Sequence, residues 1–84
     1  MATEPPISFS TFLISLAGTA LVHLGEVDDP QGQTHLDLNL ARQTIDVIQM
    51  LVEKTKGNLD AEEQRLVEAI QAELHAKYNA RLSS

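Results

Sequence analysis

The chain has 84 residues, with twelve Asp and Glu against six Lys and Arg, a net charge of −6 and no cysteine. This length allows one small domain, and the missing cysteines leave it without a disulfide or a thiolate metal site. A negative charge with one Tyr, two Phe and no Trp argues against a nucleic-acid binder and against docking on an anionic membrane.

Residues 1–6 are expected to form a disordered tail, because Pro5 and Pro6 resist helix formation and nothing apolar anchors the segment. The stretch 7–24 that follows contains no Asp, Glu, Lys or Arg. At helical spacing this stretch has no side that prefers water, so the helix is expected to be buried on most sides. Ser8 or Ser10 is placed to cap it.

Two apolar faces are expected on this first helix. The first face, with Phe12 and His23 at its edge, consists of Phe9, Leu13, Leu16, Ala20 and Leu24. The second consists of Ile7, Ile14 and Leu21. Gly25 is placed to end the helix.

Lipid, other copies of the chain, or the chain's own helices could cover these faces. A membrane span needs about 20 apolar residues, whereas this run is shorter and contains five hydroxyl side chains. No Lys or Arg precedes it, as a signal peptide would require. Burial by protein is therefore favoured, and a membrane anchor is the alternative.

Residues 26–37 form an acidic connector centred on Asp29-Pro30-Gln31-Gly32, which has turn chemistry and leaves a short β-turn or hairpin open. The acids lack the ligand spacing of an EF-hand, so a solvated loop is favoured over a calcium site. A metal site formed by His23, His35 and Asp28 is a weaker alternative.

The second helix is expected to start near residues 38–40, with Asp37 or Asn39 as its cap. Its polar arc contains Arg42 and Asp46, which are spaced to pair on the surface. Its broad apolar arc consists of Leu40, Ala41, Thr44, Ile45, Val47, Ile48, Leu51 and Val52. Such a pattern is typical of an amphipathic helix.

A helix-turn-helix corner is predicted over residues 54–60. Its members are Lys54, Thr55, Gly57, Asn58, Leu59 and Asp60. Gly57 is expected to stop the second helix at positive φ with Leu59 closing a Schellman-type contact, and Asp60 to cap the third helix in a capping box with Glu63. A small binding role for this corner is left open, because Thr55 and Asn58 are not needed to stop the helix.

The third helix presents a narrow apolar stripe: Leu66, Val67, Ile70, Leu74 and Tyr78. Alanines occupy its other side, and residues 81–84 are expected to fray. The sequence thus predicts an all-α protein, with a single helical domain over 7–82 and a frayed end at 83–84.

Three stretches of the sequence resemble a short bacterial family catalogued as domain of unknown function 1844. They are F-x-x-F-x-x-S-L-A-x-x-A-L-x-x-L-G from Phe9, L-A-R-x-x-I-D from Leu40, and M-L-x-x-K-T-x-G-N-L from Met50. The resemblance extends from about Ser8 to Tyr78. It implies a bacterial, cytoplasmic protein, and because that family has no established activity, cofactor or catalytic residue, it transfers no site.

Nothing in the sequence predicts an enzyme, a cofactor or a catalytic residue. The expected function is protein association, as a homo-oligomer (most simply a dimer) or with an unidentified protein partner. A membrane-associated accessory protein and a small metal-binding protein are the alternatives. The predicted oligomer interface comprises Ile7, Phe9, Leu13, Ile14, Leu16, Gly18, Leu21 and Leu24. Gly18 with Ser15 and Thr19 would let two helices approach closely, unless Gly18 fits a crowded crossing inside the chain.

Overall fold

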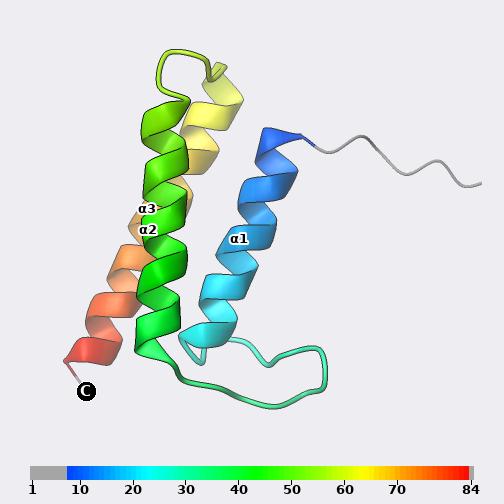
Figure 1. The fold of residues 1–84 in the computed structure, drawn as a ribbon, viewed down its shortest axis with the longest axis vertical. Helices are drawn as coiled ribbons and strands as arrows, with labels where there is room; N and C mark the ends of the chain where they lie inside the picture. The colour runs from blue at the N-terminus through cyan, green and yellow to red at the C-terminus, as the bar shows by residue number, and fades with distance from the viewer. Residues whose placement is uncertain (1–7, 84) are drawn as a thin grey trace, which may run out of the picture.

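A computed structural model of the protein describes residues 8–83. These residues form three α-helices: α1 (Phe9–His23), α2 (Leu38–Lys54) and α3 (Ala61–Leu82). Consecutive helices run in opposite directions, with a long connector between α1 and α2 and a short one between α2 and α3 (Figure 1). The all-α prediction is confirmed, and residues 8–83 contain no strand. The predictions for residues 1–7 and for Ser84 lie outside the described residues.

All three helices contribute to one core. Its buried members are Leu13, Ala17, Ala20, Leu24, Ala41, Ile45, Ile48, Val67, Ile70 and Leu74. Six of these ten positions come from the predicted faces of the first and second helices, and three from the predicted stripe of the third. The tenth, Ala17, was not included in either predicted face of the first helix. The 3.6-residue periodicity therefore identified the side of each helix that faces the other two.

Both ends of α1 are capped by side-chain or backbone hydrogen bonds. Ser8, and not Ser10, is the N-cap, because its hydroxyl accepts a hydrogen bond from the Thr11 N–H at 3.1 Å. At the other end Gly25 has φ 74° and donates its N–H to Val22 O, while the Glu26 N–H donates to Leu21 O. This pair of bonds is the Schellman motif, which confirms Gly25 as the residue that stops the helix.

The connector forms a turn, and the hairpin that the sequence left open is absent from it. The Gly32 N–H donates to Asp29 O at 2.8 Å, and the Asp29 N–H donates to Gln33 O at 2.9 Å. One oxygen of the Asp29 side chain also accepts from the N–H groups of Gln31 and Gln33, at 2.9 Å each. The carboxylate thereby satisfies amide donors that would otherwise need a partner strand.

Asp37 caps α2 by accepting from the Leu40 N–H at 3.0 Å. The end of α2 differs from the prediction: the helix stops at Lys54 with Thr55 as its cap, and no Schellman motif forms at Gly57. The Thr55 hydroxyl donates to Leu51 O at 2.7 Å and so satisfies a carbonyl of the last turn. Gly57 does have positive φ, 88°, but as part of the turn closed by Asn58 N–H and Thr55 O at 2.8 Å.

The predicted capping box of α3 is confirmed. The Glu63 N–H donates to Asp60 Oδ1 at 2.8 Å, and the Asp60 N–H donates to Glu63 Oε1 at 2.9 Å. The expectation that the chain frays from Arg81 is wrong, because α3 continues to Leu82. Arg81 Nη2 lies 3.1 Å from Glu26 Oε2 and fastens the last turn to the end of α1.

Candidate functional site

The predicted interface residues occupy three different environments. Leu13 and Leu24 are fully buried inside the single chain, so they are already used by its own core. Ile14 is exposed, and Ile7 lies outside the described residues. The other four are half-buried: Phe9, Leu16, Gly18 and Leu21. The charge-free helix is thus covered on its core side by α2 and α3, and its opposite side is open.

Gly18 belongs to this open side. A Cβ built at Gly18 would meet no atom within 4 Å, so the idea that Gly18 fits a crowded crossing inside the chain is wrong. Its neighbours along the helix surface, Ser15 and Thr19, are exposed. The Thr19 hydroxyl donates a hydrogen bond to Ser15 O at 3.2 Å, so this side chain has a hydrogen-bond partner within its own helix. The prediction that copies of this helix cross at Gly18 stays a prediction.

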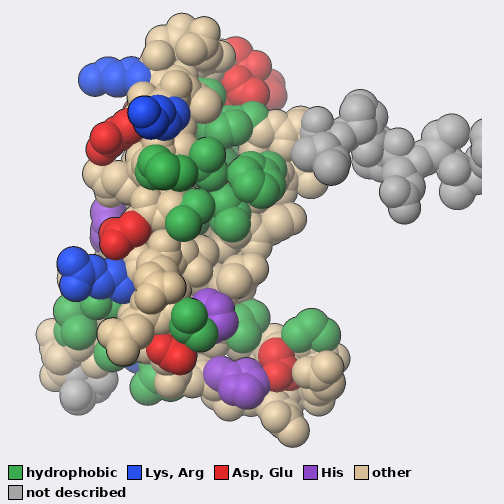
Figure 2. All heavy atoms as spheres, in the orientation of Figure 1, with side chains coloured by type: hydrophobic (Ala, Val, Ile, Leu, Met, Phe, Trp, Pro, Cys, Tyr) green, Lys and Arg blue, Asp and Glu red, His purple; other side chains and the backbone are tan. Residues whose placement is uncertain are grey.

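The exposed apolar side chains are unevenly distributed over the three helices. On α1 and α2 they are Phe12, Ile14, Leu40, Val47 and Met50, with exposed fractions of 41–57%. On α3 the large apolar side chain that is exposed is Leu82, in the last turn. We call the set Phe12, Leu40, Val47 and Met50 the α1–α2 face. Figure 2 shows hydrophobic side chains gathered over the upper parts of α1 and α2.

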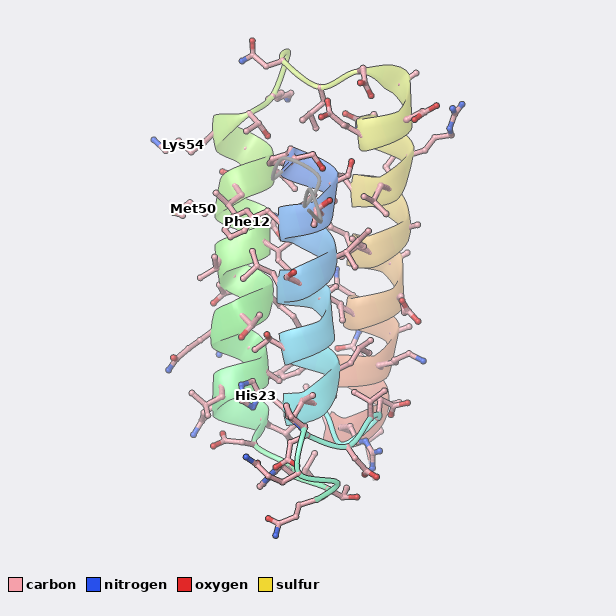
Figure 3. All side chains as sticks on the ribbon, turned by 90° about the vertical axis from the view of Figure 1, so that its right-hand side faces the viewer. Phe12, His23, Met50 and Lys54 are labelled. Carbon is pink, nitrogen blue, oxygen red and sulfur yellow. The ribbon has the colours of Figure 1, made fainter. Side chains whose placement is uncertain are left out.

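The α1–α2 face joins residues that are far apart in sequence. Phe12 of α1 and Met50 of α2 lie next to each other on the same side of the molecule, with Lys54 above them and His23 below (Figure 3). Ile14 is two residues from Phe12, which places it on the other side of α1. The face is therefore built by the packing of α1 against α2, with Ile14 outside it.

The sequence predicted part of this face. Phe12 was placed at the edge of the first apolar face, and Leu40 and Val47 were included in the broad apolar arc of the second helix. Each is 41% exposed. The arc was too broad for the two helices available to cover it. The seven-residue spacing of Leu40, Val47 and Lys54, with Met50 between, could have revealed a second stripe.

Most residues of the predicted helix-turn-helix corner have structural roles. Thr55 and Asp60 cap helices, Gly57 and Asn58 form the turn between them, and half-buried Leu59 packs against the core. Lys54 is exposed and belongs to no ion pair within residues 8–83. Thr55 had seemed unnecessary for ending the second helix, but its hydroxyl caps that helix, and this structural role explains the residue without a bound ligand.

The three residues of the metal-site alternative are not brought together. His35 Nε2 pairs with the Asp29 carboxylate, and Asp28 accepts a hydrogen bond from the Thr34 hydroxyl at 2.6 Å. Within residues 8–83 no group of three or more His, Cys, Asp or Glu side chains is arranged to hold a metal ion. The hydrogen bond from the Gln33 N–H, helped by His35 and Gln31, lowers the pKa of the Asp29 carboxyl. This carboxylate organises a turn.

Residues 8–83 contain no pocket, so the candidate site is a surface. No helix in this part of the chain is long and apolar enough to cross a bilayer. In α1 the buried side chains of Leu13, Ala17 and Ala20 contact protein, which removes them from any lipid contact.

Comparison with known proteins gives one match. A family model described as domain of unknown function (DUF1844) matches residues 6–80, which confirms the resemblance found in the sequence. No curated protein and no solved structure matches the chain. The match covers α1 and α2 completely and α3 as far as residue 80.

Proposed function

Because the chain belongs to the DUF1844 family, described as a domain of unknown function, we propose its role from its own surface: a protein-association module that forms homodimers through α1 and α2. The observation that carries this proposal is the α1–α2 face. Four large apolar side chains, each 41–50% exposed, are concentrated on the side formed by the two helices. Large exposed apolar side chains gathered on one side of a small protein are typical of an association site.

The distribution of charge supports the same surface. Between Phe9 and His23 there is no Asp, Glu, Lys or Arg, whereas the chain as a whole carries a net charge of −6. Two such chains repel each other unless they meet through a surface with few charges. Charge-free α1 offers such a surface, while the exposed side of α3 contains Glu68, Glu73 and Arg65.

The small size of the domain supports association with a second copy. Among residues 8–83 the buried core contains ten residues, and the chain has no cysteine and so no disulfide to add stability. Small scaffolds of this kind commonly enlarge their core by oligomerisation, most often as closed two-fold dimers.

The test is light scattering on a sizing column at tens of micromolar protein, where we expect a mass near twice the 9.2 kDa of the chain. Phe12→Glu and Met50→Glu should each reduce this mass toward that of the monomer, because a charge would be buried in the interface. Both side chains are about half exposed, so the folded monomer should tolerate the changes.

The matched control is Ile14→Glu. Ile14 is a large apolar residue of the same helix, 57% exposed, but it lies outside the α1–α2 face. It should leave the mass unchanged, and circular dichroism should show equal helix content in all three variants. A wild-type protein that is monomeric under these conditions overturns the proposed function.

A further inference from the structure

We infer that the homodimer is antiparallel: a two-fold axis runs across the helices, so that α2 of one copy lies against α2 of the other with the chain direction reversed. This inference rests on the proposed function, and it adds the geometry of the interface and the charged residues that select it. The observation is that, within residues 8–83, Lys54 at the upper end of the α1–α2 face has no acidic partner, while three carboxylates of the connector at the lower end have no Lys or Arg partner.

The upper end of the face contains one exposed lysine. Lys54 is the last residue of α2, it lies above Met50 on the same side of the molecule, and it is exposed (Figure 3). Its nearest helical neighbour of opposite charge, Glu53, is on the polar arc with Asp46. Within residues 8–83 Lys54 has no carboxylate partner at ion-pair distance.

The lower end of the face is acidic. The connector 26–37 contains four carboxylates and no Lys or Arg. Glu26 is paired with Lys77 and Arg81, at 3.7 and 3.1 Å. Asp28, Asp29 and Asp37 have no Lys or Arg partner in the described part of the chain. Figure 2 shows acidic and histidine side chains at this lower end of the same side of the molecule.

These charges distinguish the two ways in which the face can meet its own copy. An axis along the helices would bring the two connectors to one end, where their acids repel, and the two Lys54 side chains to the other. An axis across the helices brings each Lys54 to the acidic connector of the other copy, twice per dimer. Charges within a Debye length of about 8–10 Å interact at physiological salt, so the second arrangement is favoured.

The middle of the face fits this arrangement. Val47 lies seven residues from Leu40 and seven from Lys54, so an axis near Val47 superimposes the lower end of one α2 on the upper end of the other. Reversed copies of α1 then also meet, and neither contributes a charge. Two helices about 10 Å wide whose axes lie 8–10 Å apart present a face about 20 Å wide, and with about 22 Å of helix length it covers about 400 Å² in projection on each copy. Two copies would bury about 800 Å² in total, which is less than a standard specific interface, so we expect a weak dimer that dissociates on dilution.

The absence of cysteine from the chain makes cross-linking a sharp test. Single-cysteine variants at exposed positions of the face, Leu40→Cys, Val47→Cys and Lys54→Cys, are treated with a short thiol-specific cross-linker. Val47→Cys should cross-link to its own copy. Leu40→Cys and Lys54→Cys should cross-link little when each is alone and should form a mixed dimer when combined. The two positions are 14 residues apart, about 21 Å along one helix, so a short linker separates the two geometries.

Reversing the charge of Lys54 tests whether this residue stabilises the antiparallel dimer. Lys54→Glu should raise the dimer dissociation constant about tenfold, because two favourable pairs become repulsive, and the effect should shrink as salt is added. The matched control, Arg65→Glu on exposed α3, makes the same change in net charge and should have little effect.

The outcomes separate the two proposals. A dimer in which Lys54→Cys links efficiently to its own copy, and not to Leu40→Cys, overturns the antiparallel arrangement and keeps the homodimer. A dimer in which none of the three positions cross-links places the interface elsewhere and overturns this inference as well. A protein that is monomeric by light scattering overturns the proposed function and the inference with it.

Discussion

Gly25 and Gly57 both have positive φ, 74° and 88°, but only Gly25 is also crowded. A Cβ at Gly25 would lie 2.9 Å from His35 O, whereas a Cβ at Gly57 would have nothing within 4 Å. Gly57→Ala should therefore lower the free energy of unfolding by about 1 kcal/mol through backbone strain alone. Gly25→Ala should lower it by clearly more, because the connector must also move. Urea unfolding of both variants measures the difference, and equal losses would contradict this explanation.

Gly18 is the opposite case, a helical glycine with φ in the normal range and open space around it. Gly18→Ala should raise the free energy of unfolding of the monomer by about 0.5–1 kcal/mol, because alanine loses less backbone entropy in a helix. The measurement is urea unfolding in the dissociated Phe12→Glu background. If Gly18→Ala instead weakens the wild-type dimer, α1 helices cross closely at this position, as the sequence suggested.

Asp29 should make the fold sensitive to acid. Hydrogen bonds from the Gln33 N–H, His35 and the Gln31 N–H hold the pKa of its carboxyl below the ordinary value of 3.8. A pKa depressed in the folded state means that ionised Asp29 stabilises the fold above its ordinary pKa, and that this contribution is lost as the pH falls through the lowered value. Thermal melts from about pH 5 down to pH 2 should show a smaller loss for Asp29→Asn than for the wild type. Asp46→Asn, which removes an exposed carboxylate of α2, is the control.

At the scale of the helices, the last turn of α3 is held by a contact between residues 55 positions apart in the sequence. Glu26 pairs with Arg81 at 3.1 Å and with Lys77 at 3.7 Å, and all three side chains are about one-third exposed. A double-mutant cycle with Glu26→Gln and Arg81→Ala should give a coupling energy of about 0.5–1 kcal/mol. Hydrogen exchange near residues 79–82 should accelerate in both single variants. A coupling near zero would mean that the helix end is held by packing alone.

This contact also shows what the sequence could and could not reveal. The capping box at Asp60 and the stop at Gly25 are local patterns, so they were predictable from a few neighbouring residues. The ordered helix end at Arg81 could not be predicted, because the partner of Arg81 is 55 residues away and nothing near Arg81 in the sequence indicates that partner. The choice between turn and hairpin in the connector likewise depended on where the Asp29 side chain directs its oxygen atoms.

The candidate site was predictable to the same degree. A charge-free helix indicated that some surface of α1 must be covered, and the core side was identified from periodicity. Which part of the broad α2 arc stays open depends on the angle at which α1 and α3 pack against it, a property of the assembled fold. Leu40 and Val47 of the predicted apolar arc therefore lie on the exposed face, and Leu13 and Leu24 of the predicted interface lie in the core.

For the molecule as a whole, the two sides have different character. Exposed alanines with acidic and basic residues cover the outer side of α3, while the α1–α2 face is apolar in its middle and charged at its ends. An association that buries this face stabilises the folded state only to the extent that the dimer is populated. Stability and association are therefore linked through protein concentration.

This linkage gives the last prediction. The thermal midpoint of the wild type should rise as the protein concentration is increased from about one to a few hundred micromolar, because mass action favours the folded dimer over two unfolded chains. The midpoint of Phe12→Glu should not change with concentration, since its folded state is the monomer. Ile14→Glu, with its exposed position outside the face, should keep the wild-type dependence. A wild-type midpoint that is the same at all concentrations would show that folding and self-association are not linked, whatever mass the sizing column reports.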